Sequence, residues 1–442
     1  MPEFLAESFL EASRGTQILV AIGLILIGGA LAARIANNLR LPSVTGYVAV
    51  GILIGPYGIG VLSHELVTEH LRVFADMALM IVAFTIGKLM DFRFMHIDYR
   101  RPIIIPSAEA FGAFGVVTLG MLVLLLLPIR SSMVSSGSFL GSTMPLALLF
   151  GAIAMATAPA STLAVVKEYG SQTLLTRCLT MSVAVDNALA IGVFGVVQVL
   201  GQEVLMADVP SGILQGLLIA VGRIVGALLW GALVAVLLHP FIERQKEHGP
   251  VLMVTLGTIL LCAGVAEVLQ FPSLLSGIAL GIVMSNSYRA DRHAFEALEK
   301  FEPPLFAIFF VIAGAHFDLT AFAGSVLVVL VYVCGRIGGK YLGAKLATKA
   351  LHVEDCLRQF LGLTLVPEGG VGIALVFVVQ SIPQFASFSS LITAVVLTSV
   401  AITEIIGPPL THWALHRSGS RELADAHEQA KQDEEQRLRS GG

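Results

Sequence analysis

Asp186 and Asn187 are adjacent polar residues in the middle of an otherwise apolar segment, SVAVDNALAIGVF. Placing an ionised carboxylate at the centre of a bilayer costs about 3 kcal/mol, so acids at that depth mark ion pathways and proton relays. Asp186 is therefore the first candidate for a functional residue. The alternative interpretation is a structural aspartate that is held by hydrogen bonds.

The preceding apolar segment is interrupted at ATAPAST, where Thr157, Pro159 and Ser161 stand in the middle. Proline within a helix removes a hydrogen bond and clashes with the carbonyl four residues before it. Within a membrane, backbone freed in this way is tolerated only where protein or a water-lined cavity satisfies it. We therefore predict a broken helix beside Asp186, with a packing kink as the alternative.

A second interruption occurs near the end of the chain, where Pro367, Glu368, Gly369 and Gly370 break an apolar helix. Two Gly/Pro-interrupted segments in corresponding places of the two halves are typical of transporters built from inverted repeats. The binding site is expected where the broken helices meet, and the helix termini exposed there need compensating charges.

The composition is that of a polytopic membrane protein, because 56% of the 442 residues are hydrophobic, only 13% are charged and the mean hydropathy is +0.84. The four cysteines lie in or beside apolar segments without metal-ligand spacing. Basic residues form no stripe outside the short loops, so a nucleic-acid partner is not expected.

A membrane span needs about 20 apolar residues, and this template predicts about thirteen spans. The chain divides into an N-terminal interfacial segment (1–15), a transmembrane domain (16–414) and a short charged cytoplasmic tail (415–442). The predicted spans are 16–33, 43–61, 71–89, 103–128, 145–166, 176–200, 211–239, 250–270, 272–286, 303–316, 323–348, 358–381 and 388–413.

The distribution of basic residues predicts the orientation. Alternating spans place all but five of the 27 Lys and Arg residues on the face that carries the C-terminus. Because positive residues favour the cytoplasmic side, we expect the N-terminus outside and the C-terminus in the cytoplasm. The exceptions are Arg14, Arg72 and Arg130 on the other face, and Arg223 and Arg336 within spans.

Several segments together resemble the monovalent cation/proton antiporters of the sodium/proton exchanger superfamily. LPSVTGYVAVGILIGP from Leu41 and ALMIVAFTIGKLMDF from Ala78 are similar to the second and third spans of that family. LLSGIALGIVMSN near Leu274 and PLFAIFFVIAGAHFDL near Pro304 are similar to two later segments, and ATAPASTLAVVKE resembles the fifth-span motif.

The chain departs from the family pattern at three positions. Many relatives carry Asp-Asp or Asn-Asp in the sixth span, whereas the order here is Asp186 and then Asn187. Ala158 stands where many relatives have an acid, and Glu368 stands where relatives often have Arg or Gln. Glu368 is therefore a candidate for a partial replacement of the missing acid.

The resemblance implies that Asp186 binds either a proton or a cation. A partly desolvated carboxylate suits this role, since burial favours its protonated form and a bound cation favours its ionised form. We expect Asp186 and Thr157 to be the metal ligands, with Ser161, Asn187 and Glu368 also at the site. Each hydroxyl or amide could instead be a helix contact.

Other charged residues receive roles from their positions. Arg336 matches the basic residue of the family's eleventh span and is expected to compensate the helix termini. Its alternative is to reach the cytoplasmic face, as Lys340 and Lys345 are expected to do. Glu109 is a candidate for the cytoplasmic funnel or for helix packing. Glu404 is interpreted as structural, and Arg223 either faces a dimer interface or pairs with an acid.

The sequence thus predicts an all-helical membrane protein with inverted repeats and two broken helices crossing at the midplane. The expected function is exchange of Na+ or K+ for protons, electroneutral and by alternating access, in a homodimer of the inner cell membrane with no cofactor. The alternative is a symporter or uniporter of a small organic ion on the same fold. No HExxH or GxSxG motif occurs, so an enzyme is not expected.

Overall fold

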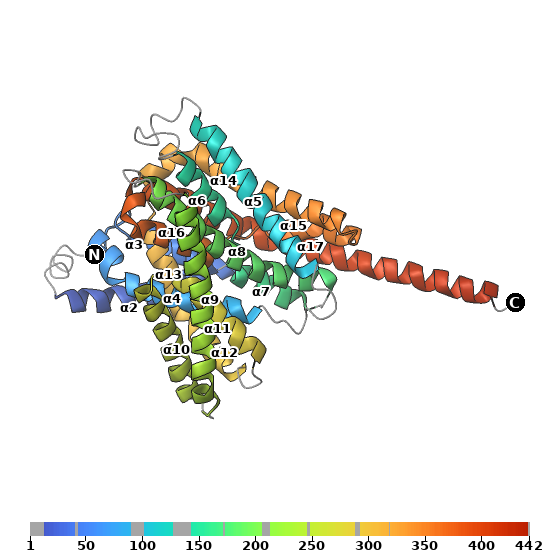
Figure 1. Cartoon of the computed structure of the whole chain (residues 1–442), viewed down its shortest axis with the longest axis horizontal. Helices are drawn as coiled ribbons and strands as arrows, with labels where there is room; N and C mark the ends of the chain where they lie inside the picture. Colours follow the sequence, from blue (N-terminus) through green and yellow to red (C-terminus); the bar gives the residue numbers. More distant parts are fainter. Residues whose placement is uncertain are drawn as a thin grey trace.

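The computed structural model describes residues 13–39, 43–89, 101–126, 143–170, 173–205, 213–244, 248–287, 292–317 and 319–440, and these ranges are helical without any β-strand (Figure 1). The longer helices are α2 (Arg14–Asn38), α3 (Ser43–Ile54), α4 (Arg72–Leu89), α5 (Arg101–Leu126), α6 (Met144–Ala154), α7 (Pro159–Tyr169), α8 (Leu174–Leu205), α9 (Ile213–Glu243), α10 (His248–Val268), α11 (Ser273–Ser287), α12 (Arg292–Glu299), α13 (Glu302–Ala315), α14 (Leu319–Ala350), α15 (Asp355–Thr364), α16 (Gly370–Ser381) and α17 (Ala386–Ser440). Two short helices, η1 (Leu66–His70) and η5 (Pro383–Phe385), lie before α4 and α17.

Seven helical segments among the described residues are long and apolar enough to cross a membrane on their own. Further apolar helices of 10–17 residues lie between them, and these include one half of each broken helix, Met144–Ala154 and Gly370–Gln380. Every predicted span coincides with one helix or with a broken pair of helices. The chain is therefore a multi-pass membrane protein, while the number thirteen remains a prediction.

Both predicted interruptions are confirmed. The first broken helix consists of α6 and α7, joined by residues 155–158, and the second consists of α15 and α16, joined by residues 365–369. Pro159 is the first residue of α7, where a proline costs no intrahelical hydrogen bond. The two connecting segments meet directly, because Ala158 N donates a hydrogen bond to Pro367 O at 3.0 Å.

Glycines let α5 and α14 approach each other closely. A Cβ atom added at Gly112 would lie 2.4 Å from Gly339 O, and one added at Gly343 would lie 2.3 Å from Ala108 O. Small residues allow membrane helices to pack backbone against backbone, and α5 and α14 pack in this way. This contact matters for the site because it brings the helices of Glu109 and Lys340 together.

The ends of the chain fit the predicted organisation only in part. Residues 1–12 of the predicted interfacial segment lie outside the described residues, and α2 begins at Arg14. At the other end, α17 continues without interruption to Ser440, and its last turns project away from the bundle (Figure 1). The charged tail is therefore a continuation of the last membrane helix.

Candidate ion-binding site

Asp186 lies on α8 in a cluster of fully buried charged residues. Its Oδ2 atom accepts hydrogen bonds from Thr157 Oγ1 at 2.6 Å and from Lys340 Nζ at 2.9 Å. Lys340 Nζ also contacts Glu109 Oε2 at 3.0 Å, Thr157 Oγ1 at 2.9 Å and Met155 O at 2.9 Å. Within the described residues, Asp186 Oδ1 and Glu109 Oε1 are buried without a hydrogen-bond partner. The cluster therefore has two carboxylate oxygens available for a proton or a cation.

Asn187 positions the extended segment of the first broken helix. Its Nδ2 atom donates to Thr157 O at 2.8 Å and to Val183 O at 2.7 Å, while its Oδ1 atom accepts from Thr157 N at 3.3 Å. These contacts occupy both polar atoms of the amide. In this structure Asn187 holds Thr157 beside Asp186, and its own oxygen is bound by protein.

Arg336 joins the two broken helices at the carbonyl ends of their first halves. Its guanidinium donates to Ala156 O, just beyond α6, and to Val366 O and Pro367 O, just beyond α15. The C-terminus of a helix carries a partial negative charge of about half an elementary charge, which a cation stabilises. The buried arginine therefore lies at these helix ends, and its charge-compensating role stays a prediction.

Glu368 lies in a second buried network beside Arg336. Its Oε1 atom accepts from Tyr332 Oη at 2.7 Å, and its Oε2 atom accepts from Ser399 Oγ at 2.5 Å. Arg336 Nε stands 3.6 Å from Oε2, which makes an ion pair. Both carboxylate oxygens are thus bound, and none of these contacts is to Asp186.

Ser161 contacts an acid other than Asp186. Its Oγ atom donates to Glu404 Oε1 at 3.0 Å, while Glu404 Oε2 is buried without a partner among the described residues. Ser161 is in the first turn of α7, and a Cβ atom added at Gly369, which precedes α16, would lie 3.3 Å from Glu404 Oε1. Helix N-termini favour negative charge, so Glu404 is placed to compensate the first turns of α7 and α16.

The prediction that Lys340 reaches the cytoplasmic face is wrong. Its side chain is fully buried between Asp186 and Glu109, so it does not belong to the basic residues of that face. Glu109 is also fully buried and lies in the cluster beside Lys340. The sequence did contain a signal, because Lys340 follows Arg336 by four residues, and residues at this spacing share one face of a helix.

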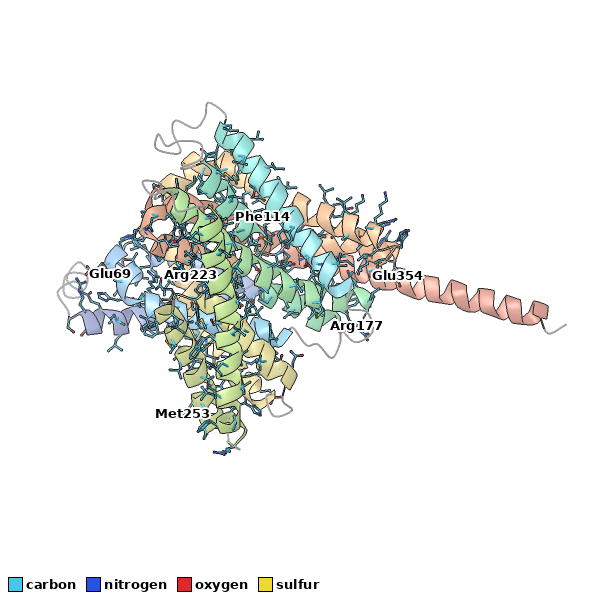
Figure 2. All side chains as sticks on the ribbon, viewed as in Figure 1. Glu69, Phe114, Arg177, Arg223, Met253 and Glu354 are labelled. Atoms are coloured by element: carbon cyan, nitrogen blue, oxygen red, sulfur yellow. The ribbon has the colours of Figure 1, made fainter. Side chains whose placement is uncertain are left out.

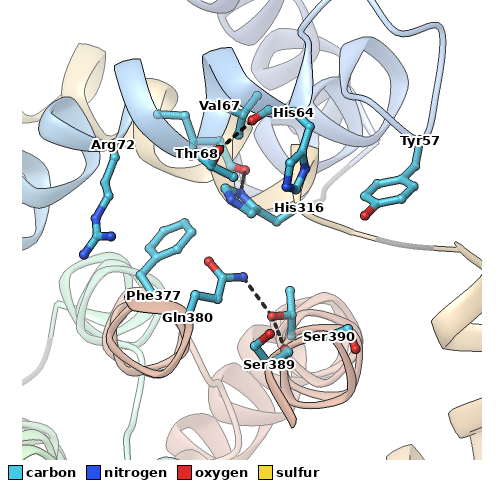
Figure 3. Close-up of a pocket in the computed structure, with 12 residues that line it drawn as sticks. Tyr57, His64, Val67, Thr68, Arg72, His316, Phe377, Gln380, Ser389 and Ser390 are labelled. Carbon is cyan, nitrogen blue, oxygen red and sulfur yellow. Dashed lines mark hydrogen bonds between the residues drawn. The ribbon is translucent and has the colours of Figure 1, made fainter. Parts of the chain in front are cut away.

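Two cavities lie away from the cluster. A cavity of about 250 Å³ is lined by Tyr57, His64, Arg72 and His316 together with residues of α16 and α17 (Figure 3). A larger cavity of about 650 Å³ is lined from α4, α8, α9, α10, α11 and α16. Arg223, which Figure 2 labels on α9, lines the larger cavity together with Asp76 and Glu267. The lining of this cavity thus contains two acids and two arginines, and Arg72 pairs with Asp76 at 3.7 Å.

Comparisons with known proteins agree with this architecture. The family described as "Sodium/hydrogen exchanger, transmembrane" matches residues 22–413. The high-affinity Na(+)/H(+) antiporter NhaS3 of Synechocystis is 22% identical over 438 residues, which cover 89% of this chain and 88% of that protein. The glutathione-regulated potassium-efflux system protein KefC of Salmonella paratyphi B is 27% identical over 433 residues, and the match spans 93% of this chain but 63% of KefC.

The fold has a counterpart among solved structures. The sodium proton antiporter MjNhaP1 from Methanocaldococcus jannaschii superposes with a TM-score of 0.71 at 18% identity, covering 91% of this chain and 98% of that one. This likeness shows a shared fold, and the family match extends over most of the chain, from the first described membrane helix to the last. The chain therefore belongs to the transmembrane sodium/hydrogen exchanger family.

Proposed function

We propose that the chain exchanges a monovalent cation, Na+ or K+, for protons, with Asp186 as the shared binding group. The observation that carries this proposal is the state of the Asp186 carboxylate. It is fully buried beside the crossing of two broken helices, and its Oδ1 atom has no partner among the described residues. A proton or a cation at that oxygen would supply the missing partner, and the two exclude each other because they compete for the same charge.

The relatives support this choice of substrates. NhaS3 is named as an Na+/H+ antiporter, and KefC is named as a potassium-efflux system protein. Both names point to monovalent cations, and they leave Na+ and K+ open for this chain. A symporter or uniporter of a small organic ion on the same fold has no such support from the relatives.

Alternating access would move the site between the two sides of the membrane. The moving part contains α6/α7, α8, α14 and α15/α16, which carry Thr157, Asp186, Lys340 and Arg336. Ion pairs and hydrogen bonds connect these helices at the crossing, and α5 is tied to α14 by the contact between Glu109 and Lys340, so these helices can move together against the rest. Thr157 contributes a hydroxyl oxygen beside Asp186, and Arg336 stabilises the exposed helix ends throughout.

The remaining expectations from the sequence belong to the same proposal. The protein would lie in the inner cell membrane as a homodimer, with its N-terminus outside and its C-terminus in the cytoplasm. The exchange would require no resident cofactor, because the cation and the proton are both substrates. Transport without chemical conversion is in keeping with a family of transporters rather than enzymes.

Reconstituted vesicles with an internal pH dye provide the test. Addition of Na+, K+ or Li+ in turn should move protons for at least one cation, and the apparent cation affinity should fall as the pH is lowered, because protons compete for Asp186. Vesicles in which none of these cations moves protons would contradict the proposal. Proton movement that follows a small organic ion instead would favour the symporter, and entry of that ion without proton movement would favour the uniporter.

A further inference from the structure

The buried cluster around Lys340 contains two carboxylates and a single ammonium group. Lys340 Nζ lies 2.9 Å from Asp186 Oδ2 and 3.0 Å from Glu109 Oε2, and the three side chains are 0% exposed. When all three groups are ionised, the cluster carries a net charge of −1. A lone Asp186–Lys340 pair would carry none, so the surplus negative charge comes from Glu109.

The neighbouring charged groups do not cancel this surplus. Arg336 pairs with Glu368 at 3.6 Å, and those two charges neutralise each other. Tyr332 donates its hydroxyl to Glu368. Glu404, bonded to Ser161, is a further acid and adds no positive charge. An uncompensated charge in the protein interior is strongly disfavoured, so the Glu109–Lys340–Asp186 cluster needs one additional positive charge.

We propose that Glu109 is a positioning residue of the exchange, which gives the cluster one surplus negative charge for one proton or one cation to fill. The inference rests on the proposed function and deepens it. In the proton-loaded state, one carboxyl of the cluster holds the proton while Lys340 remains an ammonium. When a cation binds at Asp186, that single proton leaves, Lys340 keeps its own proton with Glu109 as its partner, and the net charge of the cluster stays at zero.

The charge count makes opposite predictions for two substitutions. Glu109→Gln leaves a neutral Asp186–Lys340 pair, so a cation can bind only with a net positive charge or after the ammonium loses its proton. The apparent cation affinity at pH 7 should fall at least about tenfold and recover at higher pH. Adding Lys340→Gln removes the ammonium and leaves Asp186 as a single negative charge, so the double variant should recover affinity at pH 7.

The experiment is a four-member cycle of wild type, Glu109→Gln, Lys340→Gln and the double variant. Each protein is reconstituted in vesicles with a pH dye, and the cation concentration for half-maximal exchange is measured from pH 7 to pH 9. Glu168→Gln serves as the matched control, because it removes the charge of an exposed glutamate on α7 and should leave the affinity unchanged. Size-exclusion profiles report whether each variant is folded.

The expected result is a weak Glu109→Gln variant whose affinity is rescued by Lys340→Gln. A Glu109→Gln variant with wild-type affinity and pH profile would overturn the inference. A folded double variant that exchanges no better than Glu109→Gln would overturn it too. If Glu109→Gln alone does not fold, the folded double variant decides the question: cation affinity at pH 7 close to that of the wild type supports the inference, and lack of exchange overturns it. Failure of the proposed function is distinguishable, because the wild type itself would then show no exchange.

Discussion

Asn187 binds the backbone of Thr157 at both of its polar atoms, since its Nδ2 atom donates to Thr157 O at 2.8 Å and its Oδ1 atom accepts from Thr157 N at 3.3 Å. The amide therefore links α8 to the extended segment of the first broken helix, beside the bond between Thr157 and Asp186. The two neighbouring residues therefore have different roles. Asp186 faces the buried cluster, and Asn187 fixes Thr157 beside it.

The first prediction concerns this link. Asn187→Asp replaces a hydrogen-bond donor by an acceptor, so the Thr157 carbonyl loses its partner, whereas Val183 O keeps the helical hydrogen bond within α8. An unsatisfied buried polar group costs about 1–3 kcal/mol, so the variant should unfold at a lower temperature in detergent and exchange more slowly in vesicles. A variant with an additional acid that is as stable as the wild type and exchanges faster would show that Asn187 is a replaced ligand instead.

The second prediction is that Asp186→Asn abolishes cation-coupled proton movement while the protein still folds. Asn keeps the volume and can still accept from Thr157 and Lys340, but it cannot hold an exchangeable proton. Asp355→Asn, which changes an exposed aspartate at the start of α15, is the matched control. Exchange by Asp186→Asn at the wild-type rate would move the site to Glu109 or Glu368.

The third prediction tests the close approach of α5 and α14. In Gly112→Ala the added methyl group would lie 2.4 Å from Gly339 O, so the helices must separate and the contact between Glu109 and Lys340 should weaken. We expect a loss of exchange of about tenfold or more, in vesicles, because both charges are buried and depend on each other. Gly115→Ala, on the same helix, meets nothing within 4 Å and should behave like the wild type.

The fourth prediction concerns Glu368. Glu368→Gln removes a negative charge near the site and leaves Arg336 without its ion-pair partner. We expect weaker cation affinity and a shift of the pH for half-maximal exchange towards lower values, since less negative charge around Asp186 favours release of its proton. The measurement is a pH series of cation-driven exchange. An unchanged pH profile and affinity would limit Glu368 to compensating the helix break.

The fifth prediction is that one cation exchanges for one proton. The buried cluster takes up one positive charge in either state, and Arg336 stays protonated because the pKa of arginine exceeds about 12. No net charge then crosses the membrane, so the rate should not respond to voltage. Exchange in vesicles clamped at different potentials checks this directly. A clear voltage dependence would mean that a second proton moves, with Lys340 or Glu368 as its carrier.

The sequence alone determined the features that depend on local chemistry. Apolar segments of sufficient length predict membrane helices. Proline and glycine residues near Pro159 and Gly369 predict helix breaks, because these residues disrupt a helix whatever its tertiary contacts are. Asp186 could be singled out because an acid in an apolar segment is costly without a function. Arg336 was singled out by its resemblance to the basic residue of the family's eleventh span, together with the need of the broken helices for a positive charge.

Only the tertiary structure decided which charges meet. Lys340 and Glu109 are 231 positions apart, and their contact depends on the fit of Gly112 against Gly339, which no local pattern encodes. Ser161 bonds Glu404, which is 243 positions away, although it stands close to Thr157 in the sequence. A buried ion pair forms where separate helices pack, so its partners are set by the three-dimensional arrangement of those helices and cannot be read from either segment alone.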